Sequence, residues 1–253
     1  MKQELIKKAF KLGNSAGVLL PIEWINKKVS VKLVEESISQ DIFEILEKSN
    51  LLKNTIGIFL AGSYARGEET ELSDIDVLIL TDEINKQVKI GKYEIIFISQ
   101  DKFEKSILKN VYLASLINEA KAILNSSLLE IYKDKIGKVQ INKNILEMES
   151  IIRINQKAIE IDEELGEKVL DETLYSLILR LREIYLIGCL KNKKIPSNKE
   201  FLNLIRRVAS EESYNAYIRI KNDLKSKKVI PVEEAKSLIE EIKRGIERLK
   251  HGK

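Results

Sequence analysis

The sequence is poor in the residues that build several common kinds of site. Its one cysteine, Cys189, excludes an internal disulfide and a cysteine-rich zinc site. Its one histidine, His251, is the third residue from the end, so histidine-based catalysis is nearly excluded as well. No apolar run reaches membrane-spanning length, and no signal peptide opens the chain. We therefore expect a cytoplasmic protein with no membrane partner.

The overall charge is also low, and this limits the range of partners. The formal net charge is +4, so the whole molecule is not expected to bind polyanions strongly. Hydrophobic residues make up 44% and charged residues 32% of the 253, as in an ordinary globular protein. This length suits two domains, or one domain and a small appendage.

The most informative stretch is residues 55–80, whose pattern predicts a strand, a tight turn, a short helix, a loop and a second strand. The first apolar run ends abruptly at Gly62-Ser63, where glycine allows a sharp turn and a close approach of a ligand to the main chain. A helix that begins there would direct free backbone N–H groups and a positive dipole end to the same point. Such an arrangement suits a phosphate group.

Two aspartates begin the second strand of this stretch. Asp74 and Asp76 are two residues apart, so in a strand their carboxylates lie side by side on one face. Two like charges so close are costly unless a cation separates them, and hard oxygen ligands suit magnesium. A Gly-Ser turn or an Asp-x-Asp pair is common by itself, but here both have apolar flanks, which favours a site over a solvated surface.

The run GSYARGEETELSDIDVLIL, residues 62–80, resembles the signature of the DNA polymerase beta-like nucleotidyltransferase superfamily. It is especially similar to the minimal nucleotidyltransferases and to kanamycin nucleotidyltransferase-like enzymes. The resemblance implies that Gly62 and Ser63 position a nucleoside triphosphate and that Asp74 and Asp76 bind divalent metal ions.

The resemblance also implies a third carboxylate from a following strand. Glu94 is the candidate, because it lies inside the apolar, strand-like run 92–98. The alternative interpretation of Glu94 is an exposed carboxylate on an edge strand. Arg66, one helical turn after Gly62, is placed to donate to a phosphate. Its alternative role is a surface ion pair with a glutamate of the loop 68–72, which we expect to be solvated.

The implied reaction is the metal-dependent transfer of a nucleoside monophosphate group from a triphosphate to a hydroxyl group, with release of pyrophosphate. ATP is the expected donor, and two Mg²⁺ ions, or Mn²⁺ in their place, are the expected cofactors. Glu94 is the general base if the protein supplies one. The acceptor stays open between an aminoglycoside-like small molecule, a protein hydroxyl and a nucleic-acid end. The weak net charge argues against an RNA end.

The alternative function is that of a DNA-binding regulator or antitoxin-like protein that uses the same fold for ligand binding or protein modification. It rests on residues 1–36, predicted as a separate β unit with strands over 4–11 and 17–21 and a third at Val29, Val31 and Leu33. The run KLGNSAGVLLPIEWINKKVSV resembles the swapped-hairpin AbrB-like (MazE-like) DNA-binding domain.

So short a unit buries too little apolar surface to fold alone, so we expect it to form a homodimer. The resemblance makes DNA a second partner through Lys7, Lys8 and Lys11. The alternative is that these lysines only keep an exposed strand pair soluble.

The expected fold is therefore α+β, with the β unit at 1–36, a central mixed-sheet nucleotidyltransferase domain at 37–138 and an antiparallel helical bundle at 144–253. A polar linker over 137–144 marks the second boundary. Helices with short connections predict the bundle, and Ser197 with Glu200 forms a capping box. The bundle is similar to the substrate-binding domain of kanamycin nucleotidyltransferase-like proteins. In it, Tyr175, Arg180 and Arg182 either line a cleft or serve packing and surface charge.

Overall fold

The computed structural model describes residues 5, 7, 9–32, 37–71 and 73–251. The chain divides into two compact units, Met1–Ile42 and Phe43–Lys253. The division falls within helix α1, Ile38–Lys48. Lys8 and Leu33, which the sequence assigned to the N-terminal unit, lie outside the described residues.

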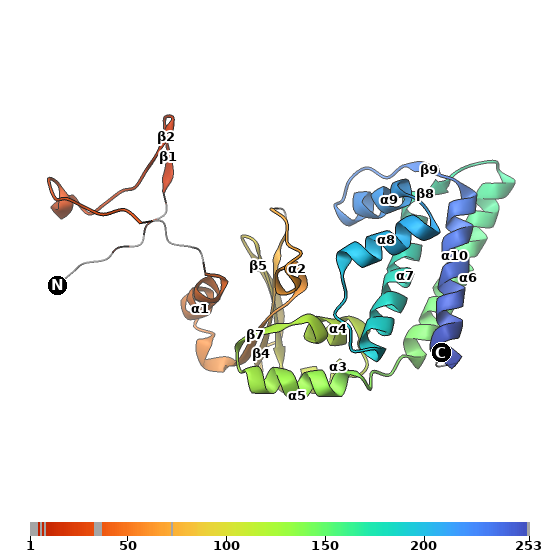
Figure 1. The fold of residues 1–253 in the computed structure, drawn as a ribbon, viewed down its shortest axis with the longest axis horizontal. Helices are drawn as coiled ribbons and strands as arrows, with labels where there is room; N and C mark the ends of the chain where they lie inside the picture. Colours follow the sequence, from red (N-terminus) through yellow and green to blue (C-terminus); the bar gives the residue numbers. More distant parts are fainter. Residues whose placement is uncertain (1–4, 6, 8, 33–36, 72, 252–253) are drawn as a thin grey trace. The chain divides into compact units, whose positions relative to one another are not determined.

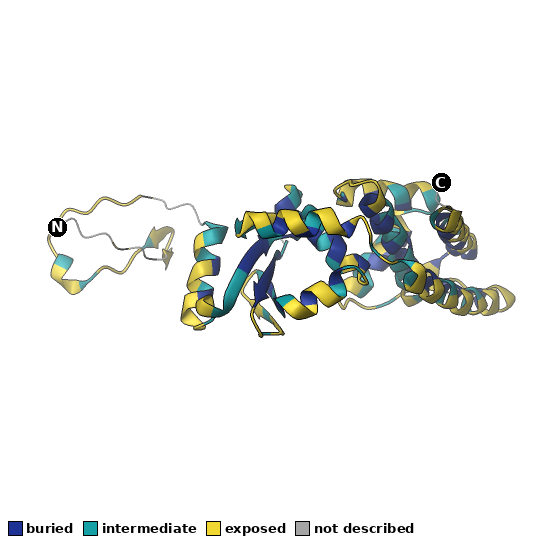
Figure 2. Cartoon of the chain, turned by 90° about the horizontal axis from the view of Figure 1, so that it is seen from below, coloured by how far each residue is buried: buried dark blue, intermediate teal, exposed yellow. Residues whose placement is uncertain are grey.

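The N-terminal unit contains a short hairpin. Strands β1 (Phe10–Leu12) and β2 (Ser15–Gly17) pair antiparallel, and the 3₁₀ turn η1 (Ile22–Trp24) follows. The predicted strands over 4–11 and 17–21 are therefore wrong at the described residues 5, 7, 9 and 18–21, because the backbone pairing is confined to the residues next to the turn. Residues 29–32 form no strand, so the predicted third strand is wrong over these residues, because alternation makes a strand only where a backbone partner is present. Among the residues of this unit described up to Lys32, none is buried (Figure 2). The unit therefore has no core of its own in this part.

The second unit is built around a mixed sheet, which confirms the α+β class. Its described strands run in the order β5-β6-β4-β3-β7. Strands β4 and β6 are parallel, and the other neighbours are antiparallel. Strands β5 and β6 form an antiparallel hairpin, and β7 lies at an edge of the sheet. The bounds are β3 Thr55–Leu60, β4 Ile75–Thr81, β5 Lys86–Ile90, β6 Tyr93–Ser99 and β7 Lys121–Leu124.

Strand β4 lies in the middle of the sheet, and its sequence explains why. Val77, Leu78, Ile79 and Leu80 are all buried, as expected of a strand covered on both faces. Leu78 and Leu80 belong to the same buried cluster as residues of the helices that follow β6, so these helices cover one face (Figure 2). Those helices are α3 Gln100–Ile107, α4 Val111–Glu119 and α5 Ser126–Ile136.

The rest of the chain is helical apart from a two-stranded ribbon. Helix α7 packs against α6, α9 and α10 (Figure 1). The Ser197 hydroxyl accepts a hydrogen bond from the Glu200 amide at 3.3 Å, so the predicted helix cap is present. The reciprocal bond of a capping box is not, because the Ser197 amide donates to the Tyr185 hydroxyl at 2.9 Å. The bounds are α6 Asn142–Glu164, β8 Val169–Leu170, α7 Asp171–Lys191, α8 Asn198–Val208, α9 Glu211–Lys221, β9 Lys228–Ile230 and α10 Val232–His251.

One buried cluster extends through this unit. It includes Leu78 of the sheet, Ile117 of α4, Leu177 of α7 and Ile239 of α10, so the sheet and the later helices share a core. The division into domains 37–138 and 144–253 therefore stays a prediction. None of the described helices combines the length and the apolar character needed to span a membrane.

Candidate active site

Three neighbouring strands place three charged side chains in a row. Asp76 of β4 lies opposite Glu94 of β6 in the parallel pairing, and Glu94 lies opposite Lys89 of β5. Residues directly opposite each other on paired strands share one face of a sheet. Asp74 immediately precedes β4 and lies two residues before Asp76. The structure therefore brings Asp74, Asp76 and Glu94 to the same part of the sheet.

Lys89 joins two of these carboxylates. Its Nζ lies 3.2 Å from Asp74 Oδ1 and 3.0 Å from Glu94 Oε1. The hydrogen bonds to Glu94 and Asp74 raise the pKa of Lys89. The lysine side chain is 58% exposed, so water screens both pairs and they stabilise the fold little. A cation nevertheless sits between two of the predicted metal ligands.

Asp76 has a pKa raised by its surroundings. Burial raises the pKa of Asp76, the negative charges of Glu94, Glu119 and Asp74 raise it further, and the charge of Arg66 opposes them. The site thus holds an excess of negative charge around one partly buried aspartate. A bound cation would relieve that excess.

The Gly62 turn lies directly against Asp76. Gly62 begins the short helix α2 (Gly62–Arg66) with φ of +66°, and a Cβ added to it would lie 1.9 Å from Asp76 Oδ2. The Ala61 amide donates to the Asp76 carbonyl oxygen at 2.8 Å. Neither the hydroxyl nor the amide of Ser63 makes a hydrogen bond within the described part of the chain. Glycine is required here both for backbone conformation and for space, and the donors of Ser63 stay available to a ligand.

Arg66 is held by two carboxylates. Its Nη1 lies 2.6 Å from Glu119 Oε2, and its Nε lies 2.9 Å from Glu68 Oε2. The Arg66 side chain is 9% exposed, so this is not a surface arginine. The expectation that Glu68 is a solvated loop residue is therefore wrong, because the same carboxylate also accepts hydrogen bonds from Ser197 and Asn198.

Glu119 is the functional candidate that the sequence analysis missed. Its Oε1 accepts a hydrogen bond from the Gly62 amide at 2.9 Å, although the two residues are 57 positions apart. One signal could have identified it. Glu119 is the last residue of α4, where the helix dipole disfavours a carboxylate, so its charge needs compensation from elsewhere.

The donor set fits a hard divalent cation, since Asp74, Asp76 and Glu94 offer only carboxylate oxygens. In the part of the chain that the structure describes, however, no three acidic, histidine or cysteine side chains are grouped closely enough to hold a metal ion. The ammonium group of Lys89 instead lies between Asp74 and Glu94.

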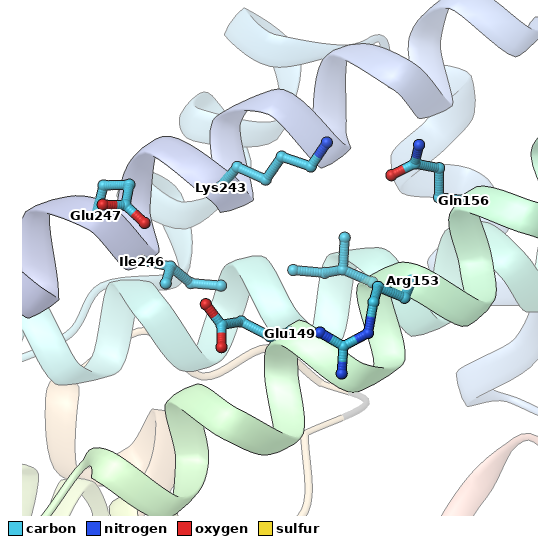
Figure 3. Close-up of a pocket in the computed structure, with 7 residues that line it drawn as sticks. Glu149, Arg153, Gln156, Lys243, Ile246 and Glu247 are labelled. Atoms are coloured by element: carbon cyan, nitrogen blue, oxygen red, sulfur yellow. The ribbon is translucent and has the colours of Figure 1, made fainter.

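A groove elsewhere in the second unit does not involve this site. A groove of about 230 Å³ lies between α6 and α10, lined by Glu149, Arg153, Lys243 and Glu247 among others (Figure 3). Glu149 is already paired with Lys250, at 2.6 Å. None of the candidate active-site residues described above lines this groove.

Comparison with known proteins assigns the class. The family model described as "Nucleotidyltransferase domain" matches residues 40–199, more than half of the chain. The chain belongs to this family, and the protein is a nucleotidyltransferase, an enzyme that transfers a nucleoside monophosphate group. Enzymes of this family generally use divalent metal ions. All the residues of the site described above lie inside the matched range.

Three known proteins are similar to parts of the chain. A protein of Methanocaldococcus jannaschii named "Putative protein adenylyltransferase" is 37% identical over 90 residues, which cover 31% of this chain and 90% of the relative. A solved nucleotidyltransferase-like protein from Exiguobacterium sibiricum 255-15 is 10% identical, with a TM-score of 0.37 over 83% of this chain and 75% of that one. A spectinomycin adenyltransferase from Enterococcus faecialis, solved with ATP and spectinomycin, is 13% identical, with a TM-score of 0.38 over 83% of this chain and 98% of the other.

Proposed function

We propose that the protein transfers AMP from ATP to a protein hydroxyl, with release of pyrophosphate and with Mg²⁺ or Mn²⁺ as cofactor. The single observation that carries this proposal is the contact between the Gly62 turn and Asp76, beside Glu94 and Asp74. It puts a candidate phosphate-binding turn next to a group of carboxylates. The name of the M. jannaschii relative supports both the adenylyl group and the protein acceptor.

In the proposed site, Asp74, Asp76 and Glu94 hold the divalent ions. Two such ions would lower the pKa of the acceptor hydroxyl and neutralise the charge of the triphosphate. The Ser63 hydroxyl and the amide of the same residue donate to the phosphate oxygens, because no described residue engages them. Lys89 must leave Asp74 and Glu94 before a metal ion can be bound, and its exposure makes this displacement cheap.

The proposed transfer forms one bond and breaks one. The acceptor oxygen bonds to the α-phosphorus, and the bond from that phosphorus to the β-phosphate's bridging oxygen breaks, so that pyrophosphate leaves. The hydroxyl proton goes to Glu94, the proposed general base. We propose that Arg66, our third nucleotide-binding candidate, acts indirectly, because both of its bonded nitrogens already serve Glu119 and Glu68.

We also propose that residues 1–36 mediate a homodimer. The described residues of this unit up to Lys32 include no buried side chain, so the unit needs another surface to cover its apolar residues. DNA is the second proposed partner of this unit. The charged candidates within the described residues are Lys7 and Lys11, and both are exposed.

The test is incubation of the purified protein with each α-labelled nucleoside triphosphate and Mg²⁺, with a cell extract as the source of acceptors. We expect label from ATP in one or a few polypeptides, release of pyrophosphate, and loss of both when EDTA is present. Label on a small molecule or a nucleic acid would overturn the protein acceptor but not the reaction.

The test variant is Asp76→Asn, and Asp101→Asn is its matched control. Both substitutions remove one carboxylate charge, but Asp101 is an exposed residue of α3 that pairs with Lys105. We expect Asp76→Asn to abolish labelling and Asp101→Asn to leave it unchanged. No Mg²⁺-dependent difference between the wild type and Asp76→Asn with any acceptor would favour the regulatory alternative.

A further inference from the structure

Glu119 forms a bridge across the short helix α2. Its Oε1 accepts from the amide of Gly62, the first residue of α2, and its Oε2 accepts from Nη1 of Arg66, the last residue. Both side chains of the ion pair are 9% exposed. Charge-assisted hydrogen bonds are about twice as strong as neutral ones, and burial reduces their screening by water.

The helix needs such support. Helix α2 has five residues, far below the length at which a helix is stable by itself. Its first residue has φ of +66° and lies against Asp76. Small displacements of this turn would therefore move both the hydrogen-bond donors of Ser63 and Gly62 itself, which lies against Asp76.

The bridge continues to the start of helix α8. Arg66 Nε donates to Glu68 Oε2 at 2.9 Å. The same carboxylate accepts from the Ser197 hydroxyl at 2.5 Å and from the Asn198 amide at 3.0 Å. Ser197 is the cap of α8, so a continuous set of charge-assisted hydrogen bonds joins the Gly62 turn, through Glu68, to a helix whose first residue lies 130 positions after Glu68.

We propose that Glu119 is a positioning residue for nucleotide transfer: with Arg66 it holds the Gly62 turn in the conformation that binds the triphosphate, and through Glu68 it ties that turn to α8. This inference rests on the proposed function. Glu119 is not a catalytic residue in this assignment, because both of its oxygens are engaged by protein donors and its side chain is nearly buried.

One competing role for Glu119 makes the opposite prediction. A carboxylate on the Gly62 amide resembles a phosphate oxygen, so Glu119 would inhibit the enzyme if the triphosphate had to displace it. The arrangement favours positioning, because Ser63 keeps its hydroxyl and amide unengaged by any described residue while Glu119 occupies the amide before it. Positioning predicts weaker nucleotide binding when Glu119 is changed, and inhibition predicts tighter binding.

The experiment compares Glu119→Gln with Asp171→Asn. Asp171 is the matched control because it forms another buried pair with an arginine, 2.6 and 2.9 Å from Arg219, and has no contact with the turn. Each variant is measured for amide hydrogen exchange over residues 60–67, for thermal unfolding, and for KM and kcat with MgATP. Arg66→Lys is the second variant, because lysine keeps the charge but cannot reproduce the forked hydrogen bonds.

We expect Glu119→Gln to speed exchange over residues 60–67 and to raise KM for ATP, each by about tenfold, as the loss of a charge-assisted hydrogen bond would. We expect a smaller rise of KM for ATP in Arg66→Lys. In Asp171→Asn we expect no rise of KM, even though the thermal stability of that variant falls. KM for the acceptor should not change in Glu119→Gln.

The remaining outcomes overturn the inference in distinct ways. If Glu119→Gln has the same amide exchange over residues 60–67 and the same KM for ATP as the wild type, Glu119 does not position the turn. A lowered KM for ATP in this variant would assign the inhibitory role to Glu119. An equal rise of KM in Asp171→Asn would reduce the effect to general destabilisation. If the wild type neither binds nor transfers nucleotide, the proposed function fails, and the exchange comparison alone decides whether Glu119 holds the turn.

Discussion

At the residue scale, the site depends on the close contact between Gly62 and Asp76. The backbone of Gly62 has φ of +66°. Residues other than glycine adopt this backbone conformation at a cost of about 1–2 kcal/mol. The missing Cβ also leaves the space that Asp76 Oδ2 occupies. One position therefore meets two independent requirements, and only the second concerns the candidate active site.

Gly62→Ala separates these two requirements when it is compared with Gly67→Ala. Gly67 has φ of +71°, and a Cβ added there would meet no atom within 4 Å, so its substitution adds backbone strain alone. We expect Gly67→Ala to lower the free energy of unfolding by about 1 kcal/mol and Gly62→Ala by about 3 kcal/mol or more. Chemical denaturation measures both. Equal losses would show that Asp76 moves aside at little cost.

The ionisation of Asp76 links the site to stability. Burial, followed by the neighbouring negative charges, raises the pKa of Asp76 above its ordinary value of 3.8, so the folded protein binds this proton more tightly than the unfolded chain does. The resulting stability is fully present below pH 3.8 and is lost as the pH rises through the higher folded-state value. At pH values above that folded-state pKa, the ionised form of Asp76 therefore destabilises the fold.

Asp76→Asn should remove this cost. We expect the variant to be more stable than the wild type at pH 7 without added metal, and the difference to shrink towards zero on acidification below the ordinary pKa of Asp76. The same variant should transfer nucleotide about a hundredfold more slowly or worse, because it lacks a proposed metal ligand. Urea titrations across the pH range test the first expectation. A less stable variant at pH 7 would contradict it.

At the element scale, two helix starts have the same design but different surroundings. Ser197 caps α8 and donates to Glu68, whereas Ser210 caps α9 and donates to Glu234, each at 2.5 Å. Both hydroxyls also accept a backbone amide of the first helical turn. The difference is that Glu68 also accepts a hydrogen bond from Arg66, the last residue of the helix that begins at Gly62.

Double-mutant cycles test this connection. We expect Ser197→Ala and Ser210→Ala each to cost about 1–2 kcal/mol of stability, the usual contribution of a helix cap. Combined with Glu68→Gln, Ser197→Ala should show a coupling of about 0.5 kcal/mol or more, while Ser210→Ala should be additive. The measurement is urea unfolding of the single and double variants. Additivity in both cycles would show that Glu68 and Ser197 are energetically independent.

At the scale of the whole molecule, the N-terminal unit stands apart because none of its residues described up to Lys32 is buried. Its apolar side chains are widely exposed, with Val31 at 81%, Ile22 at 78% and Leu19 at 75%. Such residues over so short a segment are expected to be covered by another surface. The second unit, by contrast, has one buried cluster that extends from the sheet into the late helices.

Removal of residues 1–36 should therefore change assembly and little else. We expect the full chain to be a dimer, the shortened chain to be a monomer, and the thermal unfolding midpoint and nucleotide transfer to be the same in both. Light scattering after size exclusion gives the mass of each. Leu19→Ser with Ile22→Ser in the full chain is the control that keeps the length. A monomeric full chain would overturn the dimer.

Much of the second unit could be predicted because its signals are local. Apolar runs of strand length, glycine at an abrupt turn and the two-residue spacing of Asp74 and Asp76 each act within a few neighbours, and the strands and turn formed there. The same local reasoning failed at residues 29–32, where the alternation is present but no strand forms. A strand depends on a partner, and a partner is not a local property.

The sequence by itself determined the order of strands, turns and helices and the carboxylates near the Gly62 turn, because these follow from residue type and short spacing. Only the tertiary structure decided that β6 pairs parallel with β4, which sets Glu94 opposite Asp76. It alone brought Glu119 to Gly62 and Glu68 to Ser197, 57 and 129 positions apart. The physical reason is that contacts between distant residues depend on how whole elements pack. The periodicity of residues within one helix or strand does not specify which other element packs against it.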